Sequence, residues 1–150
     1  MRLRDLLDSS VVKLDMTAGE KEEAIEELVD LLVRAGRVTD RKGVIEALLA
    51  REAQQTTGIG NGVAVPHAKH TSIPTLTAAL GISQKGVEFD SVDDKPAQVV
   101  FLIMARVNDP GPHVLALAEI ARLLQIPGLY RRLVQAKTNE ELLGVIDAEE

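Results

Sequence analysis

The sequence has no cysteine and no tryptophan, and aromatic residues make up only 2% of its 150 residues. The absence of cysteine excludes disulfides, thiolate metal sites and a cysteine nucleophile. With so few aromatic side chains, the core has to be built mainly from Leu, Val, Ile and Ala. Apolar residues still reach 45% and charged residues 27%, which is the balance of an ordinary globular protein.

Long hydrophobic runs and an excess of basic residues are absent as well. The longest apolar run, Val99 to Ala105, has the length of a buried strand and not of a membrane span. Residues 1–8 contain no apolar run long enough for a signal peptide. The formal net charge of −6 gives no general attraction to nucleic acid, although it allows docking on a basic protein. We therefore expect a cytoplasmic protein with no nucleic-acid partner and no direct membrane insertion.

Residues 1–150 show no internal repeat, low-complexity segment or linker, so we predict a single domain. Helical patterns precede, interrupt and follow a run of short segments rich in Val and Ile. This order predicts an α/β fold with a mixed central sheet of four to five strands flanked by helices. The last strand is apolar throughout, which is typical of a central strand covered on both faces. The predicted strands cover residues 11–14, 63–65, 77–83, 87–89 and 97–105.

Helix starts are predicted from capping residues. Thr17 to Glu20 and Thr138 to Glu141 both have the pattern of a capping box, in which a hydroxyl and a carboxylate satisfy free amides at a helix start. Thr39 or Asp40 is expected to open a helix that ends near residues 51–52. The other predicted helices are a short one over residues 3–8, one from Pro112 with Leu117, Ala121 and Leu124 facing inward, and one from Pro127.

Residues 53–62 are polar and rich in glycine, so we predict a loop there. Glycine lets another group approach the backbone closely, and successive free amides in such a loop can cradle an anion. We therefore take Thr57, Gly58, Gly60 and Gly62 as candidate phosphate-binding residues. The segment lacks the Lys-Ser/Thr ending of a nucleotide P-loop. A tight structural turn explains the glycines equally well.

His67 follows a short predicted strand and Pro66, so it lies at the end of an element and not within a core pattern. Imidazole is a good nucleophile at neutral pH because its ordinary pKa is about 6.5. A neutral ring nitrogen can attack phosphorus, and the product carries a charge near −2 that needs donors around it. A solvated loop histidine is the alternative interpretation.

Two further residues can complete a phosphate site. His113 lies in or beside the first turn of a predicted helix, where free amides and a partial positive charge favour a phosphate and a neutral imidazole. Arg51 lies at the predicted end of a helix just before the glycine segment, where its guanidinium can reach an anion in bidentate fashion. A partly buried capping-region histidine and a cation at a helix C-terminus are the structural alternatives.

Metal binding is the main rival chemistry. His67 and His70 have an H-x-x-H spacing, and His113 can supply a third ligand. However, the first two histidines follow a strand-ending proline instead of lying on a helix at i, i+4, and no acidic residue flanks them. We therefore predict no metal site.

The sequence also resembles a known family. The segment from Thr57 to His70, TGIGNGVAVPHAKH, resembles the active-site segment of the fructose/mannitol-type enzyme IIA domain of the bacterial phosphotransferase system. The resemblance extends over essentially the whole chain. It is also carried by LRDLL at 3–7, GVEFD at 86–90, DPGPH at 109–113 and NEELL at 139–143.

The resemblance implies that His67 is the phosphorylated residue, with His113 as the second active-site histidine and Arg51 as the arginine supporting the phosphoryl group. It implies a phosphotransferase whose donor is a small histidine-phosphorylated carrier protein charged from phosphoenolpyruvate, and it implies no bound cofactor. The chain departs from the family pattern at Thr56, where Ser is common, and at Pro112, where an aliphatic residue is more usual.

Two destinations for the phosphoryl group are found within that family. Sugar-transport members pass it to the IIB component of a membrane permease, whereas nitrogen-regulatory members signal to a target protein through their phosphorylation state. The length of the chain and its LRDLL opening resemble the free-standing regulatory type, which we take as the first expectation. A fructose/mannitol-type transport component is the alternative.

Overall fold

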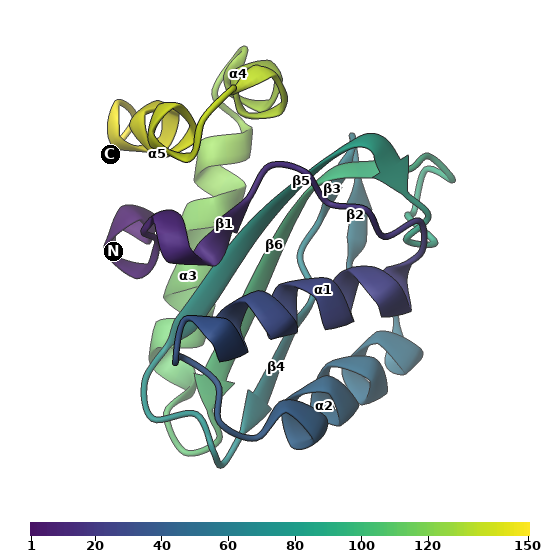
Figure 1. Cartoon of the computed structure of the whole chain (residues 1–150), viewed down its shortest axis with the longest axis vertical. Coiled ribbons are helices and arrows are strands. Elements are labelled where there is room, and N and C mark those ends of the chain that lie inside the picture. The colour runs from purple at the N-terminus through teal and green to yellow at the C-terminus, as the bar shows by residue number, and fades with distance from the viewer.

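The structure is a computed structural model that describes the backbone of residues 1–150 and every side chain except that of Pro110. It has a mixed six-stranded sheet with helices on both faces (Figure 1), so the predicted α/β fold class is confirmed. In chain order the elements are η1 Leu3–Leu6, η2 Ser9–Val11, β1 Val12–Lys13, α1 Lys21–Arg34, α2 Arg41–Gln54, β2 Gly58–Gly60, β3 Val63–Ala64, β4 His67–His70, β5 Thr77–Val87, β6 Ala97–Arg106, α3 Pro110–Leu124, α4 Leu129–Gln135 and α5 Asn139–Asp147.

β6 is the central strand, as its continuous apolar run predicts. It pairs antiparallel with β5 along one side, and β5 in turn pairs in parallel with β1. On its other side β6 pairs in parallel with β3 and then with β4, which follow one another along the same edge. The long strand β5 covers the predicted segment 77–83 and continues through a register shift to Val87, so only the first residue of the predicted segment 87–89 lies in a strand.

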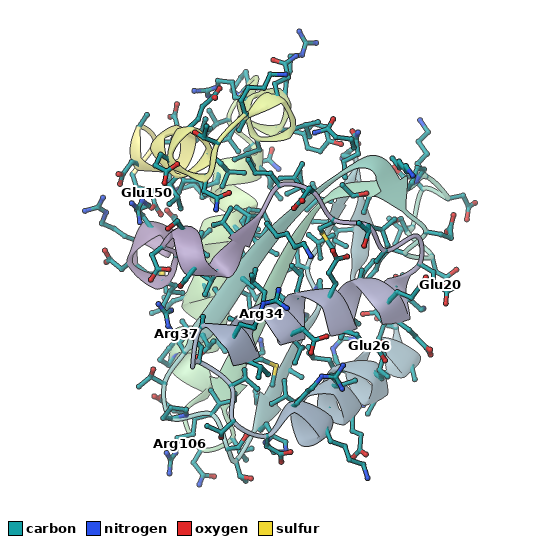
Figure 2. All side chains as sticks on the ribbon, viewed as in Figure 1. Glu20, Glu26, Arg34, Arg37, Arg106 and Glu150 are labelled. Atoms are coloured by element: carbon teal, nitrogen blue, oxygen red, sulfur yellow. The ribbon has the colours of Figure 1, made fainter. Side chains whose placement is uncertain are left out.

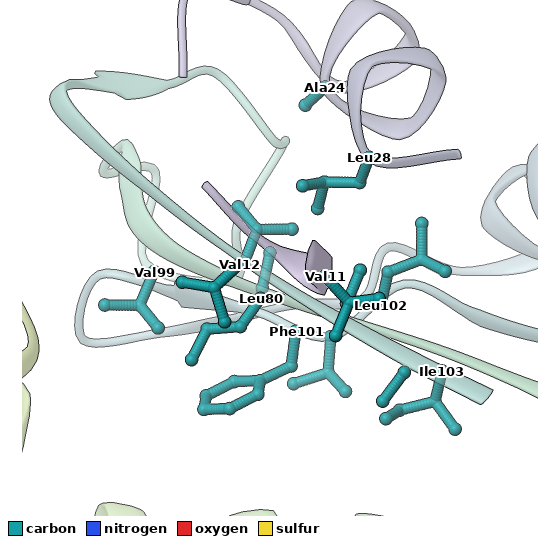
Figure 3. Close-up of a cluster of buried hydrophobic side chains, with 14 of the residues drawn as sticks. Val11, Val12, Ala24, Leu28, Leu80, Val99, Phe101, Leu102 and Ile103 are labelled. Carbon is teal, nitrogen blue, oxygen red and sulfur yellow. The ribbon is translucent and has the colours of Figure 1, made fainter. Parts of the chain in front are cut away.

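The helices cover the two faces of the sheet unequally. In Figure 1, α1 and α2 lie in front of the sheet and α3 lies behind it, while α4, α5 and the N-terminal turn gather at one corner. Ala24 and Leu28 of α1 point toward the strands, and Phe101 and Ile103 of β6 lie among the buried apolar side chains (Figure 3). Charged residues such as Glu26 and Arg34 lie on the outer side of α1 (Figure 2).

The two predicted capping boxes have different outcomes. Thr138 caps α5 as predicted, since its hydroxyl accepts a hydrogen bond from the amide of Glu141 at 3.0 Å. The box at Thr17 is wrong, because α1 begins only after Glu20. The amides of Thr17 and Ala18 donate instead to the carboxylate of Glu27, which lies in the second turn of that helix. Asp40 caps α2 through the amide of Gly43, as one of the two predicted starts requires.

The predicted loop at 53–62 is partly wrong because it contains β2. Asn61 and Gly62 have φ values of 56° and 80°, which are the left-handed conformations of a two-residue hairpin turn. This turn folds β2 back onto β3. An Asn-Gly pair between short strands is a strong hairpin signal. The hairpin contributes β2, a strand that the predicted count of four to five did not include.

The inward face of α3 also differs from the prediction. Its buried residues are His113, Ala116, Ile120 and Leu123, whereas Leu117 and Leu124 are only partly buried and Ala121 is exposed. The apolar stripe is therefore rotated by one residue, because a helix rich in apolar residues offers more than one stripe at a period of 3.6. The helix starts at Pro110, and the next one at Leu129, each two residues from its predicted start. None of the helices, as far as the structure describes them, is long and apolar enough to cross a membrane.

Candidate active site

The strand β4 positions His67. Only Val65 and Pro66 separate β3 from β4, and the carbonyl of Pro66 accepts a hydrogen bond from Ile103 of β6 at 3.0 Å, so the edge pairing continues past the proline. His67 is therefore the first residue of a strand, not a residue beyond the end of one, which corrects the prediction. It is in register with Ile103, and its ring faces α3 on the far side of the sheet from α2.

One ring nitrogen of His67 is bonded. Nδ1 lies 2.8 Å from the carbonyl oxygen of Val65. A carbonyl can only accept, so Nδ1 must carry the proton, and the neutral ring then has its lone pair on Nε2. The sequence does not distinguish the two nitrogens. In the structure, Nε2 is the ring nitrogen that keeps a free lone pair.

The pKa of His67 lies below its ordinary value, chiefly because burial disfavours the imidazolium. The Val65 carbonyl opposes this shift, since it stabilises the protonated Nδ1. The positive charges of Arg51 and Lys69 lower the pKa further, and the negative charge of Glu52 raises it. At neutral pH the ring is therefore uncharged, which is the form that can act as a nucleophile.

His113 stands beside His67 from the first turn of α3. The ring centroids are 5.1 Å apart with an angle of 59° between the planes. His113 is only 7% exposed, and its Nε2 has no hydrogen-bond partner among the described atoms. Burial, followed by the charges of His67, Lys69 and Arg51, lowers the pKa of His113 to about 4. Its ring is thus neutral at pH 7 and still has a polar atom available.

Arg51 completes the group of three that the sequence predicts. It lies in the last turn of α2, and its Nη1 donates to the carbonyl of Gln55 at 2.9 Å. Two adjacent cavities share Arg51 and His67 in their walls. One, of about 330 Å³, is also lined by His113 and Lys69. An anion on the outer side of His67 would therefore meet two cationic side chains.

The second cavity, of about 370 Å³, gives the site an apolar wall. Ile59 of β2 and Leu117 of α3 line it beside Arg51 and His67. Ile59 is 50% exposed, so this wall remains open to a partner. Leu117 and Ala121, two of the three residues predicted to form the inward stripe of α3, line this cavity.

Thr57 also lines the second cavity, but the three glycines line neither of the two cavities beside His67. A Cβ on Gly58 would lie 2.4 Å from the hydroxyl of Ser91, and one on Gly62 would lie 2.1 Å from that of Tyr130. Gly60 has a φ of 90° and precedes the hairpin turn. The glycines thus serve close packing and chain reversal, and their phosphate contact stays a prediction that the site does not need.

His70 does not join the site. Residues 67 and 70 of one strand point to opposite faces, so His70 faces α2. Its Nδ1 lies 2.7 Å from the Ser72 hydroxyl, and its Nε2 lies 3.8 Å from Asp40. An H-x-x-H metal site would require both rings on one side. The part of the chain that the structure describes contains no cluster of three or more metal-ligating side chains.

Sequence reasoning missed Glu52, a buried residue with an exposure of 4% that follows Arg51 in α2. The helix pattern contained the signal. Val44, Leu48 and Glu52 are spaced four residues apart, so the acidic residue falls on the apolar stripe of α2. Lys69, whose direction the sequence left open, lies on the same face of β4 as His67 and lines the cavity with it.

The fold thus brings two uncharged imidazoles and an arginine to the wall of one cavity, which is an arrangement suited to holding an anionic group beside a histidine. The family comparison agrees, because residues 5–149 match the model described as the phosphoenolpyruvate-dependent sugar phosphotransferase system, EIIA 2. The chain belongs to this family of phosphotransferase components, which carry a phosphohistidine.

Both branches of the family are represented among the relatives. The fructose-specific EIIA component of Haloferax volcanii is 37% identical over 136 residues, which cover 91% of this chain and 88% of that protein. The fructose-specific EIIABC component of Bacillus subtilis is 37% identical over 147 residues, and the chain spans only 23% of its length. The nitrogen regulatory protein of Bradyrhizobium diazoefficiens is 29% identical over 148 residues, which cover 97% of this chain and 95% of that protein.

Solved structures confirm the fold. The nitrogen regulatory protein IIA-Ntr of Neisseria meningitidis superposes with a TM-score of 0.87 at 30% identity, covering 96% of this chain and 98% of that chain. IIA mannitol of Escherichia coli superposes with a TM-score of 0.80 at 26% identity, covering 93% and 98%. A complex of enzyme IIAMTL with phosphorylated enzyme IIBMTL from the same organism matches with a TM-score of 0.80 at 25% identity, covering 95% of this chain and 97% of that chain.

Proposed function

We propose that His67 accepts a phosphoryl group on Nε2 from a histidine-phosphorylated carrier protein. The observation that carries this proposal is the bond from Nδ1–H to the Val65 carbonyl, which leaves the lone pair on Nε2 of a ring that lines one cavity with Arg51. The Nε2 lone pair forms the new N–P bond while the N–P bond of the donor breaks, and the electron pair returns to the imidazole of the donor. No proton has to leave His67 during the attack.

The surroundings of His67 suit the product. Phosphorylation adds a charge near −2, which Arg51 and Lys69 offset from the open side of the ring. A guanidinium can donate to two phosphoryl oxygens at once. The unpartnered Nε2 of His113 can donate a third hydrogen bond in the corresponding tautomer, with the N-terminus of α3 behind it. A neutral donor is well suited here, since the group must be released again.

For the onward step, the comparisons support both destinations equally. The Neisseria structure favours the nitrogen-regulatory type, which we retain as the first proposal, with a target protein that senses the phosphorylation state. The Haloferax relative favours transfer to the IIB component of a fructose-type permease. In either case we propose that residues 1–150 act as one type-2 IIA domain in the cytoplasm.

Radiolabelled phosphoenolpyruvate with the upstream carriers tests the first step. The wild type should acquire an acid-labile phosphate, and His67→Ala should acquire none. Labelling of His67→Ala at the normal rate would overturn the proposal. The labelled protein is then mixed with a fructose-type IIB domain. Rapid and complete transfer would support transport, whereas a stable phosphoprotein that binds a target differently from the unphosphorylated form would support regulation.

A further inference from the structure

The Val65 carbonyl that bonds His67 is linked through Thr57 to a buried carboxylate, that of Glu52. Glu52 leaves α2 on its inner face and accepts two hydrogen bonds from Thr57, one from the amide at 2.7 Å and one from the hydroxyl at 2.6 Å. Both residues are buried, with exposures of 4% and 3%. A charged group this deeply buried is costly unless it is paired or hydrogen-bonded, and here Thr57 supplies both donors.

A continuous set of hydrogen bonds leads from this carboxylate to the imidazole. The carbonyl of Thr57 accepts from the amide of Val65 at 3.0 Å, and the carbonyl of Val65 accepts from Nδ1 of His67 at 2.8 Å. Thr57 and Val65 thus each bond on two sides. If the Thr57 backbone moved, the Val65 peptide would lose its amide partner, and the carbonyl facing the ring would be free to move.

We propose that the buried carboxylate of Glu52 is a positioning residue for phosphoryl transfer at His67. It holds Thr57, and through Thr57 it holds the Val65 carbonyl that keeps the proton on Nδ1 and the lone pair on Nε2. Its negative charge also offsets the neighbouring cation of Arg51, so that the nucleophile is not made too weakly basic. The inference rests on the proposed role of His67, and it adds a residue that never touches the phosphoryl group.

Two substitutions separate the two parts of this role. Glu52→Gln removes the charge but keeps an oxygen for the Thr57 amide and an amide group for its hydroxyl. Glu52→Ala removes both hydrogen bonds. The matched control is Glu46→Gln, which changes a carboxylate on the outer side of the same helix, 65% exposed and 4.0 Å from Lys42. All three proteins are compared with the wild type as complete chains.

The first readout is ¹⁵N NMR of the histidine rings in the unphosphorylated proteins, titrated with pH. The charges around His67 come from Arg51 and Glu52 of α2, Lys69 of β4 and, when protonated, His113 of α3. Glu52→Gln should lower the pKa of His67 by on the order of half a unit and retain the Nδ1–H tautomer. Glu52→Ala should give a mixture of the two tautomers. Glu46→Gln should match the wild type in both respects.

The second readout is the rate of phosphorylation by the phosphorylated carrier. Glu52→Ala should be slower by about tenfold to a hundredfold, because a displaced nucleophile loses its alignment with phosphorus. Glu52→Gln should stay within about threefold of the wild type, since it keeps the anchor. A folded Glu52→Ala protein with an unchanged tautomer would overturn the positioning role.

The effect of the Glu52 charge on the pKa of His67 is tested separately. An unchanged pKa of His67 in Glu52→Gln would overturn this effect, and the test does not depend on whether Glu52→Ala folds. Both NMR measurements use unphosphorylated protein. They therefore judge Glu52 even if the wild type proved unable to accept a phosphoryl group, which would instead refute the proposed function.

Discussion

The two faces of β4 present the same residue type to different surroundings. His67 faces α3, where a second imidazole lies 5.1 Å away and Arg51 and Lys69 border the cavity. His70, three residues later, faces α2 and is held by Ser72, with Asp40 at 3.8 Å. The ring of His67 has one nitrogen without a hydrogen bond and lies beside two cations. In the ring of His70, one nitrogen is hydrogen-bonded to Ser72 and the other faces the carboxylate of Asp40. Their neighbours, and not the residue type, are the basis on which we propose His67 and not His70 as the carrier of the phosphoryl group.

The largest expected effect comes from exchanging each imidazole for an amide of similar polarity. His67→Gln should lose phosphorylation by at least about a thousandfold, because the nucleophilic nitrogen is removed. His70→Gln should keep a rate within about threefold of the wild type, since its ring faces away from the cavity. Rates of label incorporation from the phosphorylated carrier measure both. A comparable loss in His70→Gln would contradict the distinction between the two faces.

A smaller effect is expected from the cation beside His67. Arg51→Gln should slow phosphorylation by about tenfold to a hundredfold, because one bidentate partner of the phosphoryl oxygens is lost. Arg51→Lys should recover only part of the rate, since an ammonium cannot donate in a fork. Arg41→Gln is the matched control, as this arginine begins the same helix and pairs with Asp30 at 2.5 Å. An equal loss in the control would mean that net charge alone sets the rate.

Much of the fold could be predicted from the sequence because its signals are local. The run at 97–105 identifies the central strand, and the caps at Asp40 and Thr138 fix two helix starts. What was missed depends on partners distant in the chain. β4 has a mixed polar sequence, HAKH, with no apolar period, and it becomes a strand only because the edge of β6 is available to pair with it.

The site shows the same limit. Motif and spacing made His67, His113 and Arg51 candidates, the family resemblance singled them out, and the structure brings these three side chains together. Glycine content alone could not decide between a phosphate-binding loop and a structural turn, because positive φ values and close packing require glycine just as an anion-binding loop does. The bonded nitrogen of His67 could not be predicted, since it depends on where the Val65 carbonyl points after Pro66.

The face of β4 that carries His67 can also be tested through the pH dependence of protein stability, because the buried His113 of α3 lies beside that ring. Burial lowers the pKa of His113 from 6.5 to about 4, so the folded protein binds fewer protons than the unfolded chain between these values. Stability from the neutral ring is therefore complete above about pH 6.5 and is lost as the pH falls toward 4. Denaturant unfolding at pH 7.5 and 4.5 should show a drop larger by about 2 kcal/mol in the wild type than in His113→Asn. Equal drops would indicate that the ring is solvated.

The smallest effect is expected on the face toward α2, where the contacts serve stability. The Asp40 carboxylate accepts a hydrogen bond from the Gly43 amide at 3.0 Å and lies 3.8 Å from His70. Asp40→Ala should therefore reduce the free energy of unfolding by about 1 kcal/mol, as the loss of an N-cap usually does. Asp40→Asn should recover most of this, because an amide oxygen can still cap the helix. Neither change should alter the rate of phosphorylation beyond about twofold, because the strand lies between this cap and the nucleophile. A cap variant that unfolded normally but transferred phosphate slowly would show that the two faces of β4 are coupled.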